Sequence, residues 1–294
     1  MTENKKLEDW KKAGKIAAEA LEYGRLLINK GAKMLDVCEK IDDKIKNLGG
    51  RPAFPSQISL NSTAAHFCPG AKDEIILTDQ IAKLDVGVEV NGAIGDTACT
   101  VDLSGKNTAL VNASRDALES AIRIIKPGTK IREIGKAISE TINEAGFTPI
   151  VNLSGHGLEE YDIHAMPTIP NIDNGDETTI KEGMIFAIEP FATNGRGRVQ
   201  EAGASTIFAQ ADSKPVRDGR EILKQIEQYK GMPFTTRWIK GTEMEIRLAL
   251  RNFQQQGILI AYPPLADAGK GIVSQAEHTV LVTKNGCEVL TVLH

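Results

Sequence analysis

The sequence predicts an α+β fold built from two related halves, with a helical insertion in the second half. Three observations lead to this prediction. A pair of helix patterns near the N-terminus returns 97 residues later, each pair is followed by strand patterns, and a polar, helix-rich stretch interrupts the second set of strands. At 294 residues, the chain is long enough to bury the core of one large domain.

The two helix patterns of the first half occupy the first 50 residues. Apolar residues recur at helical spacing up to Leu27, Gly31 interrupts the pattern, and the pattern then resumes until Gly49. In the second copy, Gly128 and Gly146 stand at the corresponding breaks, and no gap is needed to align the copies. Two unrelated amphipathic helices can also look alike, but the shared glycines favour duplication of one unit.

Strand patterns follow each helical pair. Residues 81–103 contain two alternating apolar runs around Asn91-Gly92, a dipeptide typical of a two-residue hairpin turn. After the second pair, residues 183–191 predict a buried strand, and residues 271–283 predict its partner. The second hairpin therefore carries a long insertion where the first has a tight turn.

The insertion runs from about residue 195 to residue 269. It is polar and predicts helices near 217–229 and 241–256. No low-complexity linker or shift in composition separates it from the remainder of the chain. We therefore expect residues 1–294 to form a single catalytic domain, with 195–269 as a helical insertion subdomain within it.

Composition and charge exclude several classes of protein. With 35 Lys and Arg against 39 Asp and Glu, the chain has no basic field, which disfavours nucleic-acid binding. No apolar run reaches the roughly 20 residues that span a bilayer, and the polar N-terminus lacks the core of a signal peptide. The four cysteines are scattered without a C-x-x-C pair, which is typical of reduced thiols. We expect a soluble, cytoplasmic protein.

Two aspartates share one face of the first predicted hairpin. Counting from the turn, Gly87 lies opposite Asp96, and Asp85 then lies on the same face as Asp96 and diagonal to it. Diagonal residues stand about 7–8 Å apart, and carboxylates that close repel each other unless a proton or cation lies between them. The face is either a polar surface or a close-packed floor, and the neighbouring Gly, Ala and Val residues favour the floor.

The second set of strands carries two glutamates. Glu189 ends the apolar run 184–188, and Glu277 precedes the apolar run 278–282. A carboxylate inside a buried strand is costly unless it is paired or bound to a metal. Four acids, two from each half of a duplicated unit, therefore predict a cation site.

Two histidines are candidates for an imidazole ligand. His156 is flanked by glycines, and His164 follows eight residues later. A lone histidine is more often structural, but four carboxylates that require a cation favour one of these two as a ligand. Bridging carboxylates with one imidazole suit two divalent ions of the Mn, Fe, Co or Zn type, which activate water and polarise a carbonyl or phosphoryl group. The residues predict a dinuclear metallohydrolase.

In its motifs, the sequence resembles the type 2 methionine aminopeptidases of archaea. The similar phrases occur in order along the chain: AFPSQISLNSTAAH (53–66), KLDVGVEVNGAIGDTA (83–98), LSGHGLEEYDIHA (153–165), FAIEPFAT (186–193), AYPPL (261–265) and EHTVLVT (277–283). The resemblance implies the pita-bread fold of creatinase and the aminopeptidases, in which two pseudo-symmetric αβ halves surround a curved antiparallel sheet. The long insertion favours type 2 over type 1.

The resemblance also implies a ligand set for two divalent ions, Co, Mn, Fe or Zn. One ion would be held by Asp96, His156, Glu189 and Glu277, and the other by Asp85, Asp96 and Glu277. Asp96 and Glu277 would therefore bridge the two ions.

The implied reaction removes the N-terminal initiator methionine from nascent proteins and peptides. A hydroxide activated by the two metal ions would attack the carbonyl, and Glu189 would shuttle a proton to the leaving amine. The remaining site residues implied by the resemblance are His66 and His164, which would hydrogen-bond the scissile amide, and Phe54, Ile163 and Tyr262, which would line the methionine pocket.

Two other functions stay open. A Xaa-Pro dipeptidase or aminopeptidase P shares the fold and the ligands, but such relatives usually carry an additional N-terminal domain, and only about 80 residues precede Asp85 here. A non-catalytic homologue that binds ribosomes is the second alternative, but such members lose metal ligands. For an active enzyme we expect a monomer that binds the N-terminal methionine of nascent peptides, with transient ribosome association and without direct binding to nucleic acid or membrane.

Overall fold

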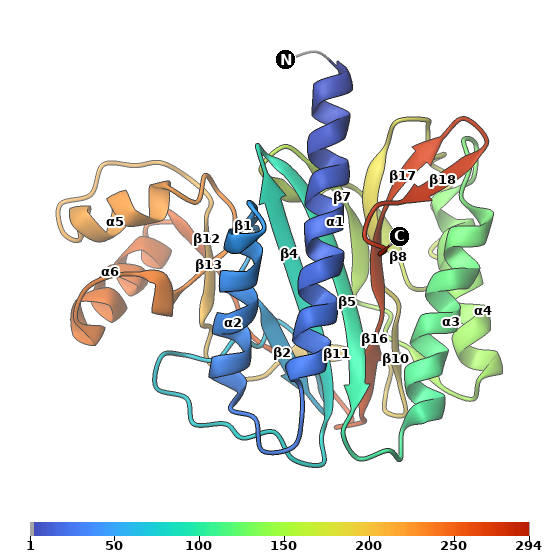
Figure 1. Ribbon diagram of the computed structural model, residues 1–294, viewed down its shortest axis with the longest axis horizontal. Helices are drawn as coiled ribbons and strands as arrows, with labels where there is room; N and C mark the ends of the chain where they lie inside the picture. The colour runs from blue at the N-terminus through green and yellow to red at the C-terminus, as the bar shows by residue number, and fades with distance from the viewer. Residues whose placement is uncertain (1–2, 294) are drawn as a thin grey trace.

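The computed structural model describes residues 3–293, which form an α+β fold (Figure 1). The helices are α1 (Glu3–Leu27), α2 (Met34–Asn47), α3 (Thr108–Ile124), α4 (Ile131–Glu144), α5 (Arg220–Glu227), α6 (Glu243–Gln255) and the 3₁₀ helix η1 (Thr236–Trp238). The strands of the large sheet are β1 (Arg51–Pro52), β2 (Gln57–Leu60), β4 (Ile81–Val90), β5 (Ala93–Asp102), β7 (Ser154–Glu159), β8 (Asp162–Pro170), β9 (Ile185–Ile188), β17 (Glu277–Thr283) and β18 (Gly286–Val289).

The remaining strands form three small sheets. Their members are β3 (Thr63–Ala65), β6 (Thr148–Pro149), β10 (Phe191–Thr193), β11 (Val199–Glu201), β12 (Ile207–Gln210), β13 (Phe234–Thr235), β14 (Leu259–Tyr262), β15 (Leu265–Asp267) and β16 (Val273–Gln275). The large sheet is antiparallel, in the order β1-β4-β5-β17-β9-β7-β8, with β2 also paired to β4 and β18 to β17. Strands from the two halves therefore meet where β5 pairs with β17.

The predicted duplication is visible in the helices and the breaks around them. Helices α2 and α4 both have 14 residues and keep the 97-residue offset read from the sequence. The glycines before them, Gly31 and Gly128, have φ of 89° and 93°, and those after them, Gly49 and Gly146, both have φ of 83°. Residues other than glycine disfavour this left-handed backbone conformation. The glycines are thus required by the same turn in each half.

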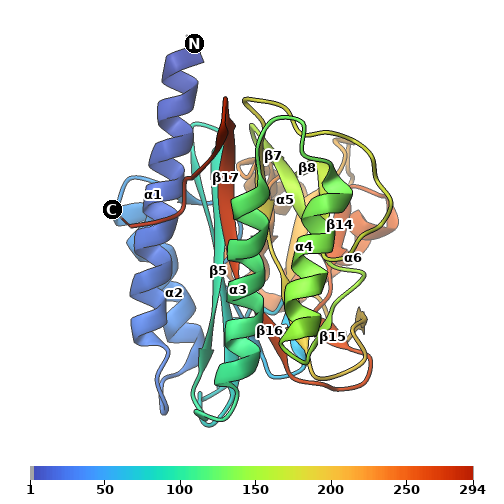
Figure 2. The ribbon, with the colours of Figure 1, turned by 90° about the vertical axis from the view of Figure 1, so that its right-hand side faces the viewer.

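Helices α1, α2, α3 and α4 cover one face of the large sheet (Figures 1 and 2). Helix α1 packs on β4 and β5, and α3 packs on β5, β16 and β17. The apolar side chains of each helical pair are buried in a hydrophobic cluster of their own half. The first cluster includes Ile41 and Leu84, and the second includes Ile138 and Phe186. The helices therefore leave the opposite face of the strands free for a site. None of the described helices combines the length and the apolar character that crossing a membrane requires.

The hairpin of β4 and β5 has the predicted register. Asn91 and Gly92 both have positive φ, 52° and 97°, which is the conformation of a two-residue type I′ turn. Asp85 pairs with Ala98 and Gly87 pairs with Asp96. The prediction that both aspartates lie on one face of this hairpin is confirmed.

The expected continuous strands of the second half are wrong, because each is broken in two. Strand β9 ends before Glu189-Pro190 and β10 follows, while β16 and β17 are separated at Ala276. Proline has no N–H for a sheet ladder, so the first break follows from the sequence. The pieces still pair as predicted, β9 with β17 and β10 with β16. The breaks place Glu189 and Glu277 at strand ends beside each other.

The segment 195–269 contains more than the predicted helices. Helices α5 and α6 lie within the predicted ranges (Figure 1, left), but strands β11 to β15 also belong to this segment and were not predicted. They have two to four residues each, too few to show an alternating pattern. A hydrophobic cluster that includes Phe208, Ile226, Phe234 and Phe253 holds α5, α6 and the β12 sheet together. Its description as a subdomain stays a prediction.

One carboxylate joins the two ends of this segment. The side chain of Asp267, 2% exposed, accepts hydrogen bonds from the backbone N–H groups of Arg196, Gly197, Gly269 and Gly271. Gly195 and Gly271 lie so close that a Cβ on either would clash with the other's backbone or with Asp267. The ends of the segment are therefore clamped by charge-assisted hydrogen bonds.

We expect Asp267→Ala to destabilise the protein by at least about 3 kcal/mol, because several buried N–H donors lose their acceptor. The measurement is the free energy of unfolding in urea, with Asp218→Ala as the control. Asp218 is an exposed aspartate of the same segment. Equal midpoints for the two variants would contradict the clamp.

Candidate active site

One cavity brings together all ten side chains singled out in the sequence. It has about 480 Å³ of empty space and opens to solvent. These side chains line it: Phe54, His66, Asp85, Asp96, His156, Ile163, His164, Glu189, Tyr262 and Glu277. Residues up to 223 positions apart in the chain thus share one site, although their chemical roles stay predictions.

Strand pairing brings the acidic residues of the two halves together. Asp85 on β4 lies opposite Ala98 on β5, and Ala98 lies opposite Glu277 on β17. Asp96 stands two residues from Ala98 on β5. Because side chains two residues apart, or directly opposite each other, share a face, Asp85, Asp96 and Glu277 project from the same face of the sheet.

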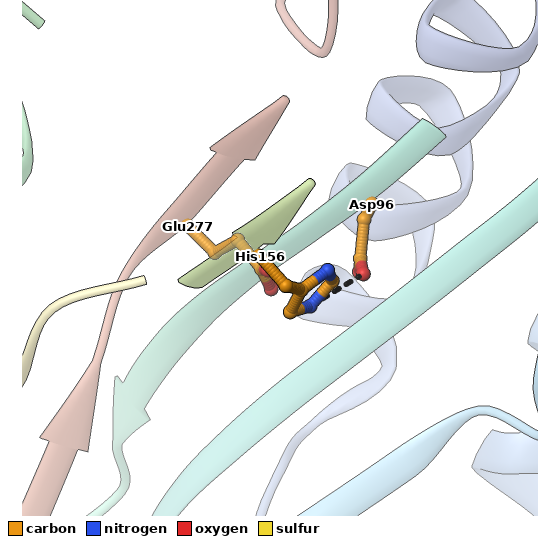
Figure 3. Close-up of side chains that lie close together, drawn as sticks. All are labelled: Asp96, His156 and Glu277. Carbon is orange, nitrogen blue, oxygen red and sulfur yellow. Dashed lines mark ion pairs between the residues drawn. The ribbon is translucent and has the colours of Figure 1, made fainter. Parts of the chain in front are cut away.

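Asp96, His156 and Glu277 form a compact group (Figure 3). Each offers one ligand atom, and these atoms all lie within 4.8 Å of one another. The Nε2 of His156 lies 3.7 Å from Oδ2 of Asp96 and 3.7 Å from Oε1 of Glu189. Of the two candidate histidines, His156 is therefore the one placed among the carboxylates.

Several carboxyl oxygens of the cavity are unsatisfied within the described part of the chain. Asp85 Oδ1, Asp96 Oδ1 and Glu277 Oε2 are buried without a hydrogen-bond partner among the described residues. Burial raises the pKa of Asp85 to about 7. Burial and the neighbouring carboxyl groups raise the pKa values of Asp96, Glu189 and Glu277 well above their usual range. A bound cation would satisfy these oxygens and reverse the repulsion, so the donor set fits divalent metal ions.

The histidines of the cavity are held in their neutral form. Burial, and next the charge of His164, lowers the pKa of His156 to about 3 and that of His66 to about 4. A neutral imidazole is the form that binds a metal. His66 also has a left-handed backbone, with φ of 64°, a conformation that is uncommon outside glycine, that histidine adopts more often than most residues and that recurs at functional sites. The ring of Tyr262 lies edge-on to the imidazole of His66, with the two ring centroids 5.5 Å apart.

The apolar part of the cavity is made by both halves and by the 195–269 segment. The ring of Phe54 lies directly on Gly87, where an added Cβ would stand 2.1 Å from Cε1 of the ring. Ile207 and Pro233 line the same cavity and were missed in the sequence. They lie on short strands or turns and belong to no motif, so only the folded structure identifies them.

Two glutamines were also missed. Gln57 lines the cavity from β2, and the Nε2 of Gln275 on β16 lies 3.4 Å from Oδ2 of Asp85. Gln57 pairs directly with Asp85 across β2 and β4. Its place beside Asp85 depends on the pairing of β2 with β4, which the four residues of β2 do not show by themselves.

The cavity, with its buried carboxylates and its neutral imidazole, has the features of a metallopeptidase site, and comparisons with known proteins identify the class. The sequence profile of Metallopeptidase family M24 matches residues 8–284. The chain therefore belongs to this family. Within it, the chain is 45% identical over 283 residues to the methionine aminopeptidase of Archaeoglobus fulgidus, which covers 95% of this chain and 96% of the relative. The resemblance to archaeal methionine aminopeptidases, which the sequence motifs indicated, is confirmed.

Solved structures confirm the predicted fold. The methionine aminopeptidase of Thermotoga maritima is 26% identical, with a TM-score of 0.74, and the similarity covers 100% of this chain and 98% of that one. A prolidase from Pyrococcus furiosus is 22% identical, with a TM-score of 0.65, and shares the fold. This chain covers only 65% of the prolidase. The prolidase thus shows the shared fold, whereas the 45% identity over 95% of this chain favours the methionine aminopeptidases over the Xaa-Pro alternative.

Proposed function

We propose that this protein removes the N-terminal methionine from peptides and nascent proteins. The observation that carries the proposal is a cavity in which four carboxyl groups and a neutral imidazole adjoin an apolar wall. The family membership and the full-length similarity to methionine aminopeptidases support the same reaction.

The donor set leads us to propose two divalent ions. Asp96, His156, Glu189 and Glu277 would hold one ion, and Asp85, Asp96 and Glu277 would hold the other. Mixed carboxylate and imidazole donors suit Mn, Fe, Co or Zn. When bound, such ions supply an activated water and polarise the scissile carbonyl.

The other side chains bind substrate and move protons in this proposal. His66 and His164 donate hydrogen bonds to the scissile amide and stabilise the charge that develops on it. Glu189, at the break between β9 and β10, passes a proton to the leaving amine. Phe54, Ile163 and Tyr262 form an apolar pocket for the thioether.

The test is methionine release from Met-Gly-Met-Met. We expect release by the metal-loaded protein, loss of release with a chelator, and recovery when Mn or Co is added back. Release from Xaa-Pro peptides alone would instead support a prolidase. Absence of both bound metal and release would support a non-catalytic homologue.

His66→Ala should lower kcat by about 10²–10³, the usual cost of removing one donor to the developing charge. The bound metal, measured by elemental analysis, should be unchanged because His66 is outside the proposed ligand set. Loss of metal together with activity would make His66 a ligand and contradict this assignment.

Three further proposals concern the location of the protein, its oligomeric state and its contact with the ribosome. Because initiator methionines are presented on nascent chains, we propose that the protein works in the cytoplasm as a monomer with transient contact to the ribosome. The acidic balance of the chain, with a net charge of −4, supports binding to the nascent peptide and not to nucleic acid.

A further inference from the structure

The side-chain amide oxygen of Gln57 is buried and has no partner among the described residues. The residue is 6% exposed and lines the cavity, and its Oε1 has no hydrogen-bond partner among the described residues. Buried polar atoms without a partner are uncommon in native proteins and destabilising. An unpaired amide oxygen that faces a cavity can accept a hydrogen bond from a donor group of a bound ligand.

The neighbours of Gln57 indicate which part of a ligand it meets. Gln57 lies opposite Asp85, so their Cβ atoms stand about 4.5–5.5 Å apart, and Asp85 Oδ1 is also without a partner. Gly87 follows two residues along β4, on the same face and about 7 Å away. The ring of Phe54 covers Gly87. The amide oxygen of Gln57 therefore lies near both an apolar surface and a residue of the proposed metal site.

This spacing matches a terminal methionine. Its side chain suits the apolar surface of Phe54, and its α-amino group, which carries N–H donors, then lies toward Asp85 and Gln57. An amide oxygen accepts such a hydrogen bond without adding charge to a cavity that already holds four carboxyl groups.

We propose that Oε1 of Gln57 accepts a hydrogen bond from the free α-amino group of the substrate and thereby selects peptides with an unblocked N-terminus. The proposal rests on the proposed function. It makes Gln57 a substrate-binding residue that acts on the amine, and not a ligand of the metal ions.

The test uses two ligands without a cleavable amide bond, norleucinol and 1-hexanol, which differ only in the amino group. Their dissociation constants are measured by calorimetry on the metal-loaded protein and on two variants, Gln57→Leu and Ser59→Ala. Ser59 lies on the same strand and face as Gln57 and is buried, but it does not line the cavity. We expect Gln57→Leu to weaken the binding of norleucinol about tenfold and to leave the binding of 1-hexanol and the bound metal unchanged. Ser59→Ala should change none of them.

Equal weakening of both ligands, or of neither, would overturn the proposal, and loss of metal from Gln57→Leu would make Gln57 a metal ligand instead. If Gln57→Leu does not fold, Gln57→Met, which keeps the length of the side chain without its carbonyl, replaces it. The two proposals fail separately: hydrolysis of Met-Ala-Ser by the unmodified protein tests the function, whereas calorimetry tests Gln57 without turnover.

Discussion

Glu189→Gln should lower kcat for Met-Ala-Ser by about 10³ or more, at the upper part of the range for removal of a proton-transfer group. The amide keeps the size of the side chain but carries no exchangeable carboxyl proton. Glu189 lies in the cavity with Oε1 3.7 Å from Nε2 of His156. The measurement is single-turnover and steady-state release of methionine at saturating metal.

The control for this variant is Glu182→Gln, which changes an exposed glutamate just before the same strand and should keep full activity. Bound metal and the melting temperature are measured for both variants. If Glu189→Gln retains most of the activity of the unmodified protein, the proton-shuttle assignment is wrong. If the variant is fully active at saturating metal and loses activity only at lower metal concentration, Glu189 acts only as a ligand.

Asp42→Ala should destabilise the protein by about 3–5 kcal/mol, because it leaves a buried guanidinium without its counter-ion. Asp42 on α2 and Arg237 on η1 are both 3% exposed, and Arg237 Nη2 lies 2.6 Å from Asp42 Oδ2. Ser56 donates to the other carboxyl oxygen from both its N–H and its hydroxyl. The pair fastens the 195–269 segment to the first half, beside the strand that carries Gln57.

Urea unfolding of four proteins measures this effect: the unmodified chain, Asp42→Ala, Arg237→Met and the double variant Asp42→Ala/Arg237→Met. Replacement of both partners by apolar groups should recover much of the stability lost by removing one. Lys72→Ala is the matched control, because Lys72 pairs with Glu243 between the same two parts but is exposed, and exposed pairs contribute little. Single variants with the midpoint of the unmodified chain would contradict the prediction.

Local sequence determined much of the fold. The left-handed turns at Gly31 and Gly128 and the turn at Asn91-Gly92 depend on backbone conformations that few residues adopt, so they can be read from a single segment. The period-2 pattern around that turn then sets which residues share a face. This is why the pairing of Gly87 with Asp96 was correct before any tertiary contact was known.

Tertiary structure determined which segments of the chain come into contact. The breaks at Glu189-Pro190 and Ala276 occur where four strands of two sheets meet, and no local pattern shows both. Three features of the site depend on which strands pair. They are the position of His156, and not His164, among the carboxylates, the presence of Ile207 and Pro233 in the cavity, and the position of the Gln57 amide beside Asp85. Side-chain identity and local period determine the chemistry that each segment brings, whereas contacts distant in sequence determine which of these groups meet.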